Sequence, residues 1–552
     1  MTAVSTQGLG AGGAHSEGKK VDLNQPMGIK TILAFLAVLA IGLFFTAYSI
    51  YVDVNKVGTP VTTLAPFFLL AVALLIALGF EFVNGFHDTA NAVATVIYTR
   101  SLPPQFAVVW SGFFNFLGVL TSSGAVAFGI ISLLPVELIL QVGAAASTGT
   151  ISDGSSAGFA MIFALLIAAI IWNLGTWWLG LPASSSHTMI GSIVGVGVMN
   201  ALMKGRDGTS GVDVGKVIEI GEALLLSPVF GFFVSAALLY SLKFLVRRKE
   251  LFSEPEPGHK PPLWIRGILV LTCTLVSFFH GSNDGQKGMG LIMLILIGTV
   301  PTAYALNRAL PQNRVDSFIS VSQAASKVVE GKAAGYAVTG NPRPAVTNYI
   351  SSKTINEGTF PSLAVLIKDV ANQVQSYGSI AKVPAAAAGN TRNDMYLTAE
   401  AVKRLSKDSS STLSADDKKV LSAYSGLLDS ATKFIPVWVK VAVALALGLG
   451  TMIGWKRIVV TVGEKIGKTH LTYGQGASAE MVAALTIGAA DVLGLPVSTT
   501  HVLSSGIAGT MAANGSGLQW ATLRSIAMAW VLTLPCAMAI SASLFYIFVH
   551  VF

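Results

Sequence analysis

Two eight-residue stretches combine a proline, a run of hydroxyl side chains and a histidine. Residues 180–187 read GLPASSSH, and residues 494–501 read GLPVSTTH. Proline suits the first turn of a helix, where the first backbone N–H groups have no partner inside the helix and the helix dipole is positive. Such a start predicts a binding site for an anion, although a single copy would be read more simply as an N-cap. The side chains expected to surround a tetrahedral oxyanion are Ser184, Ser185, Ser186, Ser498, Thr499 and Thr500.

A second pair of motifs places acids within apolar sequence. Residues 82–91 read FVNGFHDTAN and residues 278–287 read FFHGSNDGQK, so that Asp88 corresponds to Asp284. A charge at the bilayer centre costs from about 2.5 to more than about 10 kcal/mol, which favours a function for these acids over a structural polar contact. Carboxylates with neighbouring amide and carbonyl oxygens suit a hard cation such as Na⁺, or the uptake of protons. The glycine inside each motif would permit a local break in the helix.

Other polar residues in apolar runs are less informative. Glu480 is an isolated acid, and Leu166 stands at its counterpart position in the first half, so Glu480 has no symmetric partner by position. Asn115 is an intramembrane amide that could line a path. Lys287 could pair with an acid or with the anion, and both interpretations stay open. We expect no metal site, because zinc sites usually show local ligand pairs, which these histidines lack: His87, His187, His280 and His501.

Both motifs occur twice in the same order, and their spacing is similar once a charged insert is set aside. Four matching motifs indicate a duplicated chain, and a two-fold repeat in a polytopic membrane protein is typical of a transporter whose halves meet near the midplane. We therefore expect two inverted repeats with broken or re-entrant helices.

The composition supports a membrane protein. The 552 residues are 52% hydrophobic and 12% charged, with a mean hydropathy of +0.65. Soluble domains carry about 25% charged residues, so a set of soluble domains is excluded, as is disorder, which requires low hydrophobicity. Nucleic-acid binding is not expected, because no basic patch is interleaved with aromatic residues.

The hydropathy pattern predicts an all-α polytopic membrane protein with about 10–12 membrane segments. One region differs: residues 307–433 carry 25 of the 64 charged residues and should face water. The expected parts are a flexible N-terminal tail (1–30), an extra N-terminal membrane helix (31–52), a first transport repeat (64–246), the start of a second repeat (265–306), the soluble insert (307–433) and the remainder of the second repeat (434–552).

From about residue 65 to the C-terminus, the chain resembles the inorganic phosphate transporter (Pit) family, particularly its bacterial low-affinity members. The resemblance is carried by the segments NGFHDTANAVATVIYTRS, IIWNLGTWWLGLPASSSHT, HGSNDGQKGMGL, ALGLGTMIGWKR and GLPVSTTHVLSSGIAGTM. It implies secondary transport of phosphate by two inverted repeats, with the anion between the hydroxyl-rich helix starts and the cations at the two acid motifs. The apolar run at 31–52 departs from the family as an added helix.

The resemblance also assigns roles to single residues. Asp88 and Asn91 match the family's N-D-x-x-N motif, and Asn91 is placed with the phosphate site. Lys287 stands where many members have Asn, which puts a second sodium site in doubt. Glu480 matches a family glutamate, whose first-half counterpart is Asn115. The cation-coupling residues implied are Asp88, Asp284, Glu480 and Asn115.

The sequence thus favours a non-enzymatic symporter that imports inorganic phosphate across the bacterial inner membrane. Fewer acidic ligands favour protons over Na⁺, and the resemblance implies that phosphate is carried with Mg²⁺ or another divalent metal. No bound cofactor is expected, and a homodimer is left open. The alternatives are a sodium-coupled phosphate symporter, a permease for sulfate or another oxyanion, an intramembrane metallohydrolase, and a sensor or scaffold that uses the insert.

Overall fold

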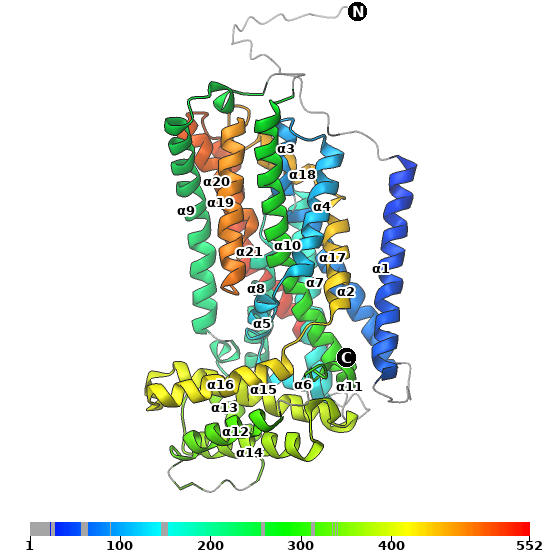
Figure 1. Cartoon of the computed structure of the whole chain (residues 1–552), viewed down its shortest axis with the longest axis vertical. Helices are drawn as coiled ribbons and strands as arrows, with labels where there is room; N and C mark the ends of the chain where they lie inside the picture. The colour runs from blue at the N-terminus through cyan, green and yellow to red at the C-terminus, as the bar shows by residue number, and fades with distance from the viewer. Residues whose placement is uncertain are drawn as a thin grey trace, which may run out of the picture.

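The computed structural model describes residues 23, 28–56, 65–88, 90–144, 153–212, 214–255, 260–310, 315–333, 335–336, 338 and 340–551. Most of the predicted N-terminal tail therefore lies outside the described residues. Every regular element in the described chain is a helix, which confirms the all-α membrane class. Long helices form a bundle, and the helices of the insert lie across one end of it (Figure 1).

The first half of the bundle follows an outer N-terminal helix. Its helices are α1 (Ile29–Lys56), α2 (Ala65–Asp88), α3 (Ala90–Tyr98), α4 (Pro104–Thr121), α5 (Ala125–Ile131), α6 (Val136–Ala144), α7 (Asp153–Trp178), α8 (Ser185–Met203) and α9 (Val214–Leu245). The second half comprises α10 (Leu263–Thr299), α11 (Pro301–Tyr304), α17 (Val437–Thr451), α18 (Lys456–Glu464), α19 (Tyr473–Val492), α20 (Thr499–Asn514) and α21 (Trp520–Val551).

The described residues contain 7 helices long and apolar enough to span a membrane, or up to 9 if each bent helix pair counts as one span. One bent pair, α4 with α5, turns by 75° at its break, in line with the expected broken helices. The total is below the expected 10–12 segments. Helices α17 and α20 are only 15 and 16 residues long, and α19 carries the buried polar residues Gln475, Ser478 and Glu480.

The break expected at the second acid motif is absent. Helix α10 runs without interruption from Leu263 to Thr299 and passes through the whole of that motif. Gly281 packs against the backbone of α4, where a Cβ would collide with the Asn115 carbonyl. The glycine therefore serves close packing and not a break. In the first copy, α2 ends at Asp88 and α3 begins at Ala90.

The two halves pack onto each other reciprocally. Helix α2 packs on α17 and its counterpart α10 packs on α4, while α8 packs on α21 and α20 packs on α9. A Cβ at Gly450 would collide with the carbonyl of Phe82, and a Cβ at Gly118 with that of Phe278; these phenylalanines open the two acid motifs. Such small residues let helix backbones approach closely. The duplicated sequence therefore corresponds to a duplicated set of helix contacts.

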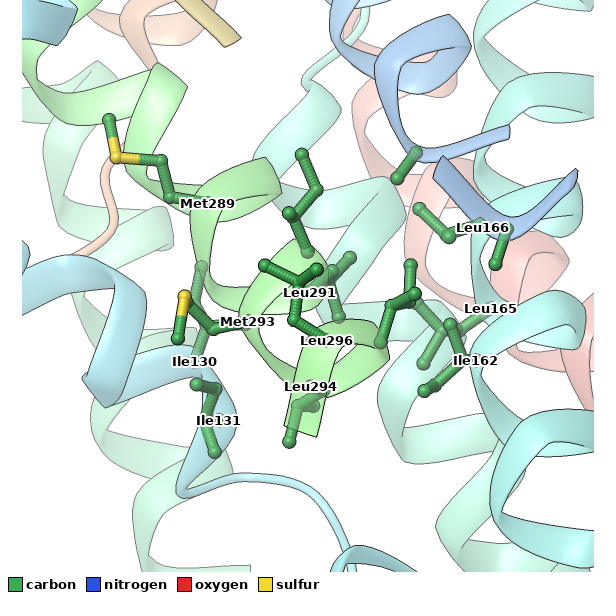
Figure 2. Close-up of a cluster of buried hydrophobic side chains, with 14 of the residues drawn as sticks. Ile130, Ile131, Ile162, Leu165, Leu166, Met289, Leu291, Met293, Leu294 and Leu296 are labelled. Atoms are coloured by element: carbon green, nitrogen blue, oxygen red, sulfur yellow. The ribbon is translucent and has the colours of Figure 1, made fainter. Parts of the chain in front are cut away.

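The apolar core surrounds the second half of α10. Leu291, Leu294 and Leu296 are almost fully buried, and they lie between Ile130 of α5 and Leu165 of α7 (Figure 2). A helix that is hydrophobic on all sides must be buried on all sides. This core holds α10 at the centre of the bundle and so fixes the polar residues one and two turns earlier along the same helix.

Helix α1 lies at the outside of the bundle (Figure 1). Its buried residues, Gly42, Thr46, Ile50 and Val54, recur every four positions and so form one stripe,. Near its C-terminal end, Asp53 accepts hydrogen bonds from the Tyr304 hydroxyl (3.0 Å) and the Trp438 indole N–H (3.1 Å). Helix α1 is therefore attached through one apolar stripe and through the two hydrogen bonds that Asp53 accepts.

The insert forms a separate helical layer with its own apolar core. Its ends come together where the Asn307 N–H donates to the Ala431 carbonyl at 2.8 Å. The layer contacts the bundle through α6 and α11. Its helices are α12 (Val315–Glu330), α13 (Arg343–Ser352), α14 (Thr359–Tyr377), α15 (Ala385–Lys407) and α16 (Ala415–Thr432).

Candidate phosphate and cation site

The two hydroxyl-rich helix starts are built in the same way. Gly180 and Gly494 adopt φ values of 67° and 68°, a left-handed conformation that glycine reaches without strain. After the proline, Ser184 caps α8 by accepting the His187 N–H at 3.3 Å, and Ser498 caps α20 by accepting the His501 N–H at 3.1 Å. The N-cap interpretation therefore holds for the first hydroxyl of each run, and the later hydroxyls remain for other contacts.

These helix starts meet inside the protein. The rings of His187 and His501 lie 4.4 Å apart between centroids, and the Ser186 hydroxyl donates to the Val497 carbonyl at 2.8 Å. His501 also stacks on Trp530, with 4.1 Å between ring centroids. All six hydroxyl residues predicted to bind the anion are buried: Ser184, Ser185, Ser186, Ser498, Thr499 and Thr500.

The first acid contacts the helix start of the opposite half. The Thr500 hydroxyl donates to Asp88 Oδ1 at 2.7 Å, and His87 Nδ1 lies 3.2 Å from the same oxygen. His87 Nε2 in turn lies 3.0 Å from the Thr176 hydroxyl. Asp88 is buried, so its charge is exposed to these partners and not to bulk water.

The second acid reaches the other helix start through a lysine. Lys287 Nζ lies 2.6 Å from Asp284 Oδ1 and donates to the Ser186 hydroxyl at 2.5 Å. The repeat alignment pairs Asp88 with Asp284 and Thr500 with Ser186. The hydroxyl of Thr500 therefore contacts the acid of the opposite half directly, whereas that of Ser186 is joined to Asp284 through the ammonium group of Lys287.

A potential cation site lies between the two acids. Asp88, His280 and Asp284 each offer one ligand atom, and these atoms all lie within 4.8 Å of one another. His280 Nε2 is 3.4 Å from Asp284 Oδ2, and His280 Nδ1 is 2.8 Å from Asn115 Oδ1. His280 and Asp284 lie one turn apart on α10, a His–Asp pair that the expectation from the sequence did not consider; that expectation of no metal site stays a prediction.

The remaining predicted residues are placed differently. Asn115 reaches this cluster through His280 and also donates to the Thr451 hydroxyl at 3.4 Å. Glu480 instead accepts hydrogen bonds from Thr95 and Thr272. Thr272 precedes His280 by two turns of α10, or about 12 Å at 1.5 Å per residue, so Glu480 lies away from the helix starts. The side chain of Asn91 lies outside the described residues.

Two acids near the site were missed from the sequence. Glu81 on α2 is fully buried, and its carboxyl group lies against Gly288, directly after Lys287. Asp491 on α19 accepts hydrogen bonds from Ser282 and Gln286, both at 2.6 Å. Glu81 could have been found, because it is an acid in an apolar run immediately before the first acid motif.

Comparison with known proteins decides the family. The model of the phosphate transporter family matches residues 84–541, which include both hydroxyl-rich helix starts, the second acid motif and the first acid motif from Asn84 onward. The chain belongs to the phosphate transporter family. This is a family of transporters, so the chain is a transporter and not an enzyme.

Members of the phosphate transporter family resemble the chain over nearly their whole length. It is 42% identical to the "Low-affinity inorganic phosphate transporter PitA" of Escherichia coli, over 87% of this chain and 96% of that protein. It is 29% identical to a "Probable low-affinity inorganic phosphate transporter" of Bacillus subtilis, over 88% and 99%. A solved structure titled "The sodium-dependent phosphate transporter" aligns with a TM-score of 0.46 and 19% identity, covering 88% of this chain and 100% of that chain.

Proposed function

We propose that the protein imports inorganic phosphate across the bacterial inner membrane by symport with cations, and that protons are the coupling cations. Its bacterial relatives are named low-affinity inorganic phosphate transporters. The observation that carries the proposal is the contact between Thr500 and Asp88, because it joins a candidate anion donor to a candidate cation ligand.

Phosphate would dock between the two helix starts. A tetrahedral oxyanion accepts several hydrogen bonds, and the starts of α8 and α20 supply hydroxyls together with the positive ends of two helix dipoles. His187 Nδ1 and both ring nitrogens of His501 are buried and have no hydrogen-bond partner among the described residues. A neutral imidazole can donate through one nitrogen, so these rings add donors to the same space.

Cations would act at Asp88, His280 and Asp284. A proton or a cation bound there lowers the cost of burying the anion's charge next to two carboxylates. The loaded protein would then alternate between the two sides of the membrane by rocking of two inverted repeats. We propose further that a divalent metal such as Mg²⁺ travels with phosphate and offsets part of its charge.

Sodium coupling is the second candidate. It is favoured by the same three side chains, whose ligand atoms lie close enough to hold one cation. Proton and sodium coupling differ in a simple observable, since only one of them makes uptake depend on a sodium gradient.

The experiment is uptake of radiolabelled phosphate into proteoliposomes with an imposed pH gradient or Na⁺ gradient, each with and without Mg²⁺. We expect accumulation with the pH gradient alone, and none in Asp88→Asn. The matched control is Asp207→Asn, because Asp207 is exposed and caps only the short turn Gly208–Gly211. Normal accumulation by Asp88→Asn would refute the coupling role, and equal competition by sulfate would refute phosphate as the preferred anion.

A further inference from the structure

We propose that Lys287 is a built-in cation that permanently occupies the cation position of the second acid motif, so that the transporter carries one cation fewer per phosphate than a symmetric site would. This inference rests on the proposed cation-coupled transport of phosphate. It concerns how many charges move, whereas the proposed function concerns whether phosphate is accumulated at all.

The ammonium group of Lys287 is surrounded by oxygen partners in the way that a bound cation would be. Its side chain is fully buried, and its ammonium nitrogen lies 2.6 Å from Asp284 Oδ1 and 2.5 Å from the Ser186 hydroxyl. An ammonium group has three donors and no acceptor. Oxygen partners gathered around a buried point charge are what an alkali cation would also require, and here that charge is tethered to α10.

The comparison of the two repeats isolates the difference. In the first repeat the Thr500 hydroxyl contacts Asp88 directly. In the second, the ammonium of Lys287 stands between Asp284 and Ser186. Three residues after the acid, the sequence has Asn91 in the first motif and Lys287 in the second. At this position the second motif therefore carries an ammonium where the first has a neutral amide.

Electrostatics closes the second position to a further cation. Two positive charges a few ångströms apart repel strongly where water is excluded, and the ammonium already neutralises Asp284. Asp88 has no lysine at the equivalent place, so the exchangeable cation is expected on its side of the cluster with His280. The same ammonium faces the start of α8 and adds positive potential where the anion would bind.

A tethered charge does not leave the protein, which makes the inference measurable. It moves with the loaded carrier and returns with the empty one, so it adds nothing to the net charge carried in a cycle. A free cation in its place would be released and would add one positive charge per phosphate. The quantity to measure is the charge-to-phosphate ratio, obtained from reversal potentials in proteoliposomes.

The test compares Lys287→Asn, Asn91→Lys and the control Lys440→Asn with the unmodified protein. Lys440 is a partly buried lysine of α17 whose ammonium donates to the Ser122 carbonyl. We expect the ratio to rise by one in Lys287→Asn, with new stimulation by Na⁺, to fall by one in Asn91→Lys, and to stay unchanged in Lys440→Asn.

Unchanged ratios in Lys287→Asn and Asn91→Lys would overturn the inference, even if the unmodified protein accumulates phosphate normally. If Lys287→Asn does not transport, binding of radioactive Na⁺ to the purified variant decides: Na⁺ binding absent from the unmodified protein supports the inference, and no gain of Na⁺ binding refutes it. If Lys287→Asn does not fold, the charge-to-phosphate ratio of Asn91→Lys decides alone. If that variant is inactive, phosphate binding that still takes up as many protons as in the unmodified protein counts against the inference. Failure of the unmodified protein to accumulate phosphate would instead refute the proposed function.

Discussion

Thr500, at the start of α20, donates a hydrogen bond to Asp88, at the end of α2, with 2.7 Å between Oγ1 and Oδ1. The two residues belong to different motifs in different halves of the chain. An anion that binds the Thr500 hydroxyl must change the environment of Asp88, and a cation that binds Asp88 must change the orientation of that hydroxyl. Each ligand therefore affects the affinity for the other, and this effect is reciprocal.

Thr500→Val should weaken this coupling. Loss of a hydrogen bond to a buried charged group costs about 1.5–3 kcal/mol, roughly a 10- to 150-fold effect. In Thr500→Val we expect the KM for phosphate and the KM for the coupling cation to rise together, as measured by initial uptake rates. Thr500→Ser keeps the hydroxyl, so both KM values should stay close to those of the unmodified protein. Thr486→Val is the control, because within the described part of the chain that hydroxyl bonds to the Val482 carbonyl of its own helix. A change in KM for one ligand alone would contradict reciprocal coupling.

Gly281→Ala should destabilise the bundle, because a Cβ there would collide with the Asn115 carbonyl of α4. Overpacking of this kind costs about 1–3 kcal/mol or more. Gly267→Ala on the same helix is a matched control, since a Cβ there meets no atom within 4 Å. Thermal unfolding of the purified proteins in detergent should show a lower Tm for Gly281→Ala only. An equal Tm for Gly281→Ala and Gly267→Ala would show that α10 and α4 can move apart at this crossing without a measurable loss of stability.

Glu480→Gln should separate phosphate binding from accumulation. Glu480 is fully buried and is held by Thr95 and Thr272, away from the hydroxyl-rich helix starts. We therefore expect equilibrium binding of radiolabelled phosphate to be nearly normal while accumulation against a gradient is lost. Loss of binding comparable with the effect of Thr500→Val would place Glu480 in the anion site instead.

Glu137→Gln should reduce stability in a pH-dependent manner. Burial raises the pKa of the Glu137 carboxyl, but hydrogen bonds and charges from Lys204 and Arg206 outweigh it and hold that pKa below its usual value. A lowered acid pKa stabilises the folded state above the ordinary pKa of about 4.3, and this contribution disappears as pH falls through the folded value. We expect a loss of about 0.5–1 kcal/mol at pH 7.

The measurement for Glu137→Gln is the Tm of the variant and of the unmodified protein across a pH series. The difference should be present at neutral pH and should shrink in acid. Glu250→Gln offers a control, because Glu250 is exposed and outside this cluster. A difference that stays constant down to acid pH would mean that Glu137 acts through packing and not through its charge.

The duplicated motifs made the centre of the site predictable. Residues that match in sequence came to lie in matching places, so Ser186 and Thr500 both connect to the acid of the opposite half. The all-α class was also predictable from the composition, and the abrupt change in charge density marked the insert that forms a separate helical layer. These features follow from the amino-acid composition and from the duplicated motifs, both of which can be read from the sequence alone.

Contacts between distant residues could not be predicted in the same way. Gly281 suits both a helix break and a close helix crossing, and only the position of α4 decides between them. Lys287 had two plausible partners until the structure placed its ammonium against Asp284 and Ser186 together. Glu81 could be recognised as an acid in an apolar run, but its position against Gly288 could not be predicted, because that glycine lies on another helix.

The reciprocal glycine crossings have a consequence for biogenesis. Helix α2 leaves the ribosome early, yet the surface that receives its Gly85 lies on α17, which is translated only after the entire insert. Helix α8 likewise packs on α21, which is the last helix described and is synthesised last of the two. The first half cannot complete its packing until α17 and α21 have been synthesised. Assembly must therefore finish after translation, and until then the first half stays in the membrane without its packing partners. Truncation of α21 alone should therefore leave the upstream half unassembled and open to proteolysis.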